Sequence, residues 1–248
     1  MSALSSLATA VDGPGCEPAR AGVLTEPVAT ITSLAFVIAA VLIPATARRA
    51  RIGGGTEDQG TPAPSVLAYA VLVAAVGLGS VIQHGPDPAW ADLAHDLPLL
   101  ATLAFVAADA LAGLTGRARR WWWWVAPTAV LTPLIVGAPR AGDLAQVGVA
   151  AIAVTLTLAR ARADARVRHR TGWALALLSL GAAIGTLGRD GRPLCVPETV
   201  WQGHGAWHVL AAVALLVLAP VIGDRVSTGA GPRPQGLDRV LRRATRTR

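Results

Sequence analysis

Two histidines lie four residues apart in the segment Trp201–Leu210, where the last long apolar stretch of the chain begins. Residues with this spacing project from one face of a helix, about one turn apart. His204 and His208 therefore predict a pair of imidazole ligands for a metal ion. Zinc used in catalysis typically takes three protein ligands and keeps a fourth position for water. The pair requires a third ligand from elsewhere in the chain.

A third histidine and two other polar residues stand near the ends of other apolar segments. His84 ends the second segment, and Ser80 precedes it by four residues and shares its helix face. Asp96 lies in the first turns of the third segment, in the stretch His95–Pro98. Ionisable residues within membrane spans are costly and by default indicate function. Each residue also has a structural interpretation, because a serine can bond the carbonyl one turn back, an aspartate can cap a helix, and a single interfacial histidine is tolerated.

Composition places these residues in a membrane protein. The 248 residues are 53% hydrophobic and only 15% charged, and their mean hydropathy is positive, which is too apolar for a soluble chain of this length. All 22 basic residues are arginine, so a rhodopsin is excluded because its retinal Schiff base requires a lysine. The net charge of +7 does not indicate nucleic-acid binding, because the arginines form short runs between apolar segments rather than one basic face.

Seven apolar segments are predicted to cross the membrane, since each approaches the roughly 20 residues that span about 30 Å of hydrocarbon. They are expected at residues 27–46, 65–83, 91–115, 121–137, 142–158, 171–187 and 201–222. The predicted fold class is an all-α integral membrane protein, a seven-helix transmembrane bundle over residues 27–222. Residues 1–26 are expected to form an extracytoplasmic arm without a cleavable signal peptide, and residues 223–248 an arginine-rich disordered tail.

The arginines predict the orientation, because cytoplasmic loops are enriched in basic residues. Eighteen lie on one side of the predicted spans and four on the other. The eighteen are Arg48, Arg49, Arg51, Arg117, Arg119, Arg120, Arg160, Arg162, Arg166, Arg168, Arg170 and seven in residues 225–248; the four are Arg20, Arg140, Arg189 and Arg192. The N-terminus is therefore expected outside and the C-terminus in the cytoplasm. This topology brings Ser80, His84, Asp96, His204 and His208 to one depth near the outer face, which predicts a single site.

These motifs resemble those of a known family. Three motifs are similar to the signature of the alkaline ceramidases and the wider CREST superfamily of seven-helix membrane hydrolases. They are Ser-x-x-x-His from Ser80 to His84, His-Asp-Leu-Pro at 95–98, and His-x-x-x-His from His204 to His208. The arm, with Cys16-Glu17 and later Glu26-Pro27, is similar to the elements that precede the first span in that family. The resemblance covers most of the chain in order.

The resemblance implies a role for each residue of the predicted site. His84, His204 and His208 would bind zinc, Asp96 would act as the acid and base, and Ser80 would stabilise the developing oxyanion. Elementary chemistry agrees, because zinc polarises a carbonyl and lowers the pKa of water toward about 7, a carboxylate can carry the proton to the departing amine, and a hydroxyl donor can stabilise a tetrahedral intermediate. The expected reaction is hydrolysis of ceramide, or of a related N-acyl lipid, to a fatty acid and an amine.

The family's alkaline ceramidases also bind calcium through the N-terminal arm. Glu17 and Glu26 match the family's calcium ligands in type, but Pro14-Gly15 replaces the family's Asp-Trp and Ala29 replaces its Asn. Calcium takes six or more oxygen ligands, and Asp12 is the only other nearby carboxylate. We therefore do not expect calcium at this arm.

Two cysteines, Cys16 and Cys195, both fall outside the membrane in the predicted topology. An oxidising location permits a disulfide, and the resemblance implies a bond between them that ties the arm to the loop before the last span. Two unpaired buried thiols are the alternative, because geometry cannot be read from sequence.

Other functions and residues stay open at this point. A non-hydrolytic receptor or sensor of the same superfamily would bind the metal without turnover, and a metal or ion transporter would need further polar residues along the bundle, where only Asp109 offers itself. His95 is expected at the membrane interface rather than as a fourth ligand, and His169 in a solvated loop. The alanine, leucine, valine and glycine residues of the predicted spans would give a substrate pocket apolar walls. Such walls suit an acyl chain but do not distinguish ceramide from another N-acyl lipid or an ester. Abundant arginine and alanine without lysine is typical of a GC-rich bacterium, and thus of its plasma membrane.

Overall fold

The computed structural model describes residues 15–53 and 63–223, and over these residues the chain is helical with no strand. The helices are α2 (Pro27–Gly53), α3 (Pro64–His84), α4 (Ala91–Thr115), α5 (Trp122–Gly137), α6 (Pro139–Ala163), α7 (Ala165–Leu187), α8 (Gly203–Leu218) and the 3-10 helix η1 (Ala219–Val221). The predicted all-α class is confirmed. Most of the predicted tail and the first 14 residues of the predicted arm lie outside the described residues.

Six of the described helices are long and apolar enough to cross a membrane: α2, α3, α4, α6, α7 and α8 together with η1. Helix α5 is apolar but has only 16 residues, which is about 24 Å at 1.5 Å per residue against a hydrocarbon thickness of about 30 Å. Residues 15–53 and 63–223 therefore contain six to seven helices suited to a multi-pass membrane protein.

Local sequence signals set where several helices begin and end. Pro64 and Pro139 occupy the first turns of α3 and α6, where the missing N–H costs nothing and the fixed φ is already helical. Helix α4 ends before Gly116, whose φ of 65° is left-handed and favours glycine. Asp164 caps α7 by accepting from the backbone N–H of Arg166 at 3.0 Å. Hydrogen bonds from the Arg166 guanidinium to its carboxylate hold the pKa of Asp164 below its usual value.

The prediction of an arginine-rich loop between residues 158 and 171 is wrong, because both flanking helices extend into this segment. Helix α6 continues to Ala163 and α7 begins at Ala165. Alanine and arginine are both strong helix formers, whereas hydropathy detects only the apolar part of each helix. His169 consequently lies on α7 rather than in a loop, exposed, with its Nε2 accepting from the indole N–H of Trp173 at 3.0 Å.

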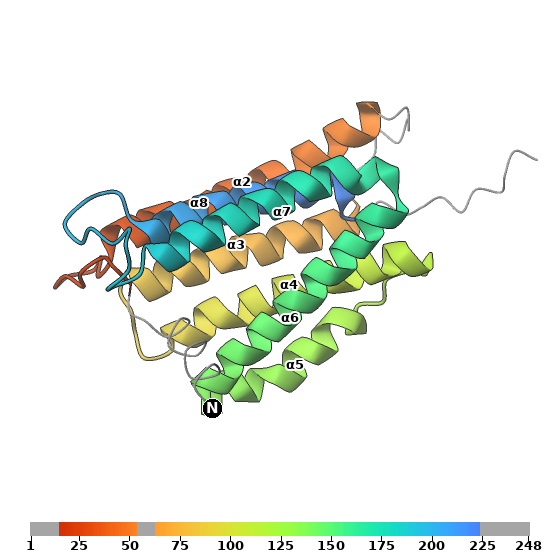
Figure 1. The fold of residues 1–248 in the computed structure, drawn as a ribbon. Coiled ribbons are helices and arrows are strands. Elements are labelled where there is room, and N and C mark those ends of the chain that lie inside the picture. The colour runs from red at the N-terminus through yellow and green to blue at the C-terminus, as the bar shows by residue number, and fades with distance from the viewer. Residues whose placement is uncertain (1–14, 54–62, 224–248) are drawn as a thin grey trace, which may run out of the picture.

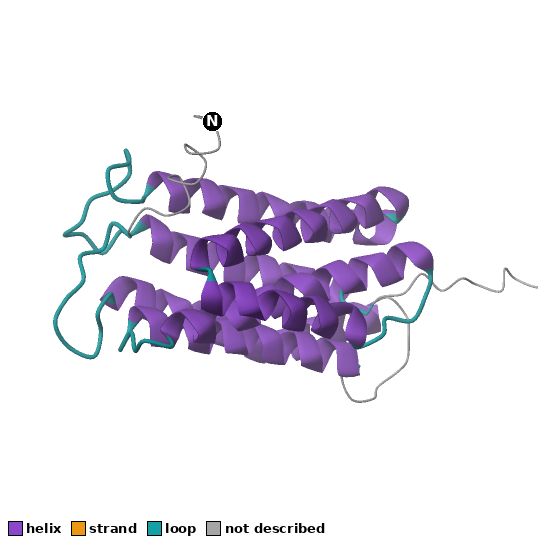
Figure 2. Cartoon of the chain, turned by 90° about the horizontal axis from the view of Figure 1, so that it is seen from below, coloured by secondary structure: helices purple, strands orange, loops and turns teal. Residues whose placement is uncertain are grey.

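Six helices pack in a closed ring in the order α2, α3, α4, α6, α7, α8 and back to α2, and α5 lies outside the ring against α4 and α6 (Figure 1). The turned view shows the same helices running along one common direction, joined by loops at the two ends (Figure 2). Inside the ring, the Tyr69 and Phe105 rings stack 6.0 Å apart, and the Tyr69 hydroxyl donates to the Leu215 carbonyl at 3.0 Å. Large apolar side chains such as Val41 and Val71 cover the outside, as suits a surface that faces lipid.

A buried charged cluster joins the helices at the end of the bundle away from His204. Asp109 of α4 accepts from the guanidinium of Arg160 on α6 at 3.2 Å, from Arg119 at 3.3 Å and from the backbone N–H of Gly223 at 3.2 Å. A Cβ on Gly113 would lie 2.5 Å from Nε of Arg160, so this glycine makes room for the guanidinium stem. Asp109, the polar residue deep in the predicted third span, thus bonds a neighbouring helix.

Candidate metal centre

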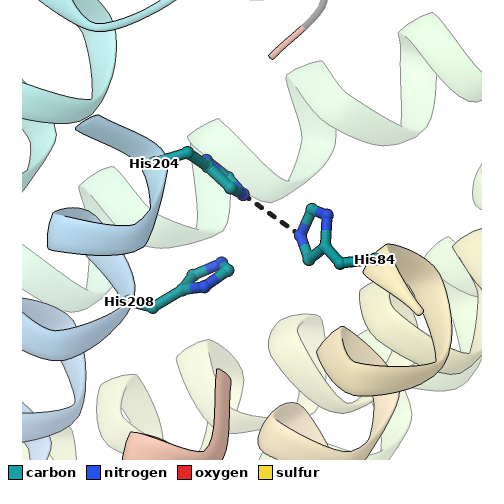
Figure 3. Close-up of side chains that lie close together, drawn as sticks. All are labelled: His84, His204 and His208. Carbon is teal, nitrogen blue, oxygen red and sulfur yellow. Dashed lines mark hydrogen bonds between the residues drawn. The ribbon is translucent and has the colours of Figure 1, made fainter. Parts of the chain in front are cut away.

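The three predicted histidines come together from two helices. His84 lies in the last turn of α3, and His204 and His208 lie in the first turns of α8. One ring nitrogen of each lies within 4.8 Å of the others, and Figure 3 shows the three rings turned toward one another. The shortest pair is Nε2 of His84 and Nε2 of His204, 3.1 Å apart. The spacing of His204 and His208 thus places two imidazoles opposite the third.

This geometry fits a tetrahedral ion. Two nitrogens that each lie 2.0–2.1 Å from a tetrahedral zinc stand about 3.3 Å apart, close to the 3.1 Å between His84 and His204. Three imidazole ligands leave a fourth position open, which is the pattern of catalytic rather than structural zinc sites. Within the part of the chain that the structure describes, this is the one group of three or more potential ligands so placed. The group supports a metal site but does not fix the identity of the metal.

A carboxylate from the arm orients the His84 ring. Oε2 of Glu26 lies 2.5 Å from Nδ1 of His84, and this hydrogen bond lowers the pKa of Glu26 below its usual value. The ionised carboxylate can only accept, so Nδ1 carries the hydrogen and the lone pair of Nε2 points at the site. The backbone holds Glu26 there, because its N–H donates to the His84 carbonyl at 2.7 Å and the N–H of Thr25 donates to Gly85 at 3.0 Å.

Two hydroxyls of α2 orient the His208 ring. Thr32 Oγ1 and Ser33 Oγ lie 3.2 and 3.3 Å from Nδ1 of His208. Each hydroxyl also lies 2.7 Å from a carbonyl one turn back, Val28 for Thr32 and Ala29 for Ser33, to which it donates its hydrogen. With their hydrogens committed, both oxygens accept from Nδ1–H of His208, which leaves its Nε2 lone pair for a metal.

Ser80 is fully buried beside this pair. Its Oγ lies 2.7 Å from Ser33 Oγ and 3.5 Å from Nε2 of His208. Because Ser33 donates to the backbone, Ser80 donates to Ser33 in this arrangement. The structure therefore brings Ser80 into the predicted site, with a hydroxyl that can turn from Ser33 toward a group bound in front of the histidines.

Two glycines allow the helices to approach closely enough to build the site. A Cβ on Gly79 would lie 2.1 Å from the Ala94 carbonyl, so α3 meets the first turns of α4 backbone to backbone. A Cβ on Gly205 would lie 3.1 Å from Oγ1 of Thr32, where α8 rests on α2. The second contact keeps Thr32 within reach of His208.

Asp96 stands apart from the three histidines. Its Oδ1 accepts from Nδ1 of the neighbouring His95 at 2.8 Å, and both side chains are about one-fifth exposed. Asp96 does not belong to the group of ligand atoms formed by His84, His204 and His208. Its assignment as the acid and base stays a prediction.

The two arm carboxylates that could have served calcium make other contacts. Glu17 is buried and accepts from the backbone N–H groups of Val28 at 2.7 Å and Ala29 at 2.9 Å, which caps the start of α2. Glu26 is committed to His84. Asp12, the other carboxylate near these two glutamates in the sequence, lies outside the described residues. Cys16 and Cys195 form a disulfide that joins the arm to the loop before α8.

An apolar cavity of about 180 Å³ lies inside the ring and is lined by residues of α2, α3, α4, α6, α7 and α8. His95, His204 and His208 line one end, and Leu218 near the end of α8 lines the other. Leu218 is 14 positions after His204 in the sequence, which corresponds to about 21 Å along the helix axis. The rest of the lining is almost entirely apolar, with only the threonines at 102 and 157 as exceptions.

No family model and no curated protein matches this chain. The resemblance to alkaline ceramidases thus stays a prediction, and the functional conclusion depends on the side chains of the site.

Sequence reasoning did not find the residues that orient the site histidines. In the sequence, Glu26 stands out only as part of the arm motif and as a calcium candidate, and Thr32 and Ser33 have no predicted role. The available signal is the presence of hydroxyl residues in the helix, because each can bond the carbonyl four residues back, as Thr32 bonds Val28 and Ser33 bonds Ala29. Which ring they face depends on the packing of α2 against α8.

Proposed function

We propose that this chain is a zinc-dependent membrane hydrolase that cleaves the amide bond of ceramide or a related N-acyl lipid, in the manner of the alkaline ceramidases that its motifs resemble. The observation that carries the proposal is the group of three imidazole nitrogens, two of whose histidines, His204 and His208, line an apolar cavity that extends along α8 to Leu218. A polar reacting centre joined to a long apolar chamber matches a lipid whose amide lies at the head of an acyl chain.

The residues around the centre divide the chemistry among them. His84, His204 and His208 would hold zinc, which supplies a Lewis acid that polarises a carbonyl and activates water. Ser80 offers a hydroxyl beside His208 for the oxyanion that develops on the carbonyl oxygen. Asp96, which accepts a hydrogen bond from His95, would belong to the group that transfers a proton from water to the leaving amine. Glu26, through His84, fixes a ring tautomer so that Nε2 faces the centre.

We also propose the finer topology that the arginines predict. Helix α5 would complete seven crossings, the N-terminus would lie outside and the C-terminus in the cytoplasm, and the centre would face the outer side of a bacterial plasma membrane. The distribution of eighteen arginines against four supports this orientation.

The cavity favours hydrolysis over transport. An ion path needs polar side chains along the bundle, whereas the cavity walls beyond the histidines are almost entirely apolar. Asp109, the one carboxylate deep in the predicted third span, accepts from Arg160 and Arg119 and is thus engaged. The receptor alternative shares the metal site and differs only in turnover, so the test below separates it.

The test measures metal content and fatty-acid release on the same detergent-purified samples. Wild-type protein should hold close to one zinc per chain and release free fatty acid from at least one member of a panel of ceramides, other N-acyl lipids and esters. His84→Ala should lose both, whereas His169→Ala, a matched change of an exposed histidine, should lose neither. Zinc without release from any lipid would refute the hydrolase in favour of the receptor, and no zinc in the wild type would refute the metal centre.

A further inference from the structure

His95, and not its neighbour Asp96, reaches the cavity. His95 lines the same end of the cavity as His204 and His208, and Asp96 is not among the lining residues. The close contact at Gly79, where a Cβ would lie 2.9 Å from Cα of His95, brings this turn of α4 against the turn of α3 that precedes Ser80. The first turns of α4 therefore bring to the cavity a histidine that is not one of the three candidate metal ligands.

The hydrogen bond between the two neighbours decides which nitrogen of His95 is available. Nδ1 of His95 lies 2.8 Å from Oδ1 of Asp96, and a carboxylate accepts from a ring N–H. Nδ1 thus carries the hydrogen, and Nε2 is the nitrogen left for the cavity. An aspartate behind a histidine in this way fixes the tautomer and stabilises the ring when it takes a second proton.

His95 is not a fourth metal ligand in this arrangement. The close group of ligand nitrogens within 4.8 Å consists of His84, His204 and His208 and does not include His95. A histidine at the cavity end, next to the group but outside it, stands where proton transfer is needed rather than coordination.

We propose that His95 is the proton carrier of the site and that Asp96 acts through it as a positioning residue. The proposal rests on the hydrolase function proposed above. Nε2 of His95 accepts a proton from the water whose oxygen bonds to the carbonyl carbon, and it gives this proton to the amide nitrogen as the C–N bond breaks. The products are the carboxylic acid and the amine, and His95 returns to its starting state.

The kinetic test uses His95→Gln, Asp96→Asn and the double variant, with His169→Gln as the matched control. General acid–base catalysis contributes about 10²–10⁴-fold, so His95→Gln should lower kcat by about that factor with zinc content and KM unchanged. Asp96→Asn should lower kcat in the same direction, and the double variant should be no slower than His95→Gln because the two residues act as one unit. Equal zinc in all variants shows that a loss of kcat is not a loss of folding.

A second measurement does not depend on turnover. Diethyl pyrocarbonate modifies histidine nitrogens that hold no proton or metal, and peptide mapping by mass spectrometry locates the modified residues. Zinc should protect His84, His204 and His208 and leave His95 reactive, and a chelator should make all four reactive. Protection of His95 by zinc equal to that of the other three would make it a ligand and overturn the proposal.

Two outcomes distinguish a failure of this proposal from a failure of the proposed hydrolase function. If wild type turns over a lipid and His95→Gln retains wild-type kcat while Asp96→Asn loses it, Asp96 carries the proton directly and this proposal alone fails. If wild type binds zinc and hydrolyses none of the lipids, the proposed function fails and this proposal fails with it.

Discussion

Replacing Glu26 by Gln tests how the arm controls the metal. The change keeps the shape of the side chain and removes the negative charge that lies 2.5 Å from Nδ1 of His84. Loss of such a partner behind a metal-binding histidine typically weakens metal affinity by 10–100-fold. Glu26 is 25% exposed, and solvent screens part of its charge, so we expect the lower end of this range. The dissociation constant for zinc should rise about tenfold, or about 1.4 kcal/mol.

The assay is competition for zinc between the detergent-purified protein and a chromophoric chelator at fixed pH. Glu198→Gln is the matched control, because Glu198 is exposed in the loop before α8 and makes the same change of charge. Zinc affinity should be unchanged in this control. A Glu26→Gln protein that binds zinc within twofold of wild type, or a control that weakens equally, would show that the carboxylate does not orient His84.

Four further changes probe the metal, the packing and the two ends of the bundle. Removing zinc with a chelator should lower the thermal midpoint, because a ligand at 100 times its dissociation constant stabilises by about 2.7 kcal/mol; added zinc should restore it. Gly79→Ala should lower the free energy of unfolding by about 1–3 kcal/mol through overpacking and should lower zinc occupancy, because its Cβ would lie 2.1 Å from the Ala94 carbonyl. Gly148→Ala is the control, because a Cβ at Gly148 meets nothing within 4 Å. Asp109→Asn should cost about 3–5 kcal/mol in unfolding experiments, because the buried Arg160 and the partly buried Arg119 lose their carboxylate partner. Zinc affinity and kcat should be unchanged. Cys16→Ser should cost about 2–5 kcal/mol by loss of the bond to the loop before α8, and reductant should change the gel mobility of wild type only.

Each of these expectations has a result that would contradict it. A thermal midpoint that is the same with and without the chelator would mean that the histidines hold no structural or catalytic ion. Equal effects of the two alanine substitutions would mean that the α3–α4 contact at Gly79 is not tight. Loss of zinc in Asp109→Asn would couple the two ends of the bundle, and identical mobility with and without reductant would argue against the disulfide.

The ligands of the centre could be predicted because they follow from helix periodicity. His204 and His208 share a face by spacing alone, and the alternation of arginine-rich connections placed His84 at the same depth. The structure brings these three together as expected. Ser80 followed from its place one turn before His84. These inferences needed only the direction and the depth of each helix.

The contacts behind the ligands could not be predicted because they depend on how the helices pack sideways. The bond from Glu26 to His84 requires residues 25–26 to pair with the end of α3, and the bonds from Thr32 and Ser33 to His208 require α8 to lie on α2. The backbone contact at Gly79 sets which of His95 and Asp96 reaches the cavity. No periodicity in one segment encodes these approaches.

The disulfide between the arm and the loop before α8 can form only late in the synthesis of the chain. Cys16 and Cys195 are 179 positions apart, and Cys195 precedes the helix that carries His204 and His208 by only eight positions. The bond can form only after nearly the whole chain has been synthesised and inserted, and only where thiols are oxidised. In a reducing compartment the protein would lack this bond. The arm that carries Glu26 would then have no covalent link to the loop that precedes His204 and His208.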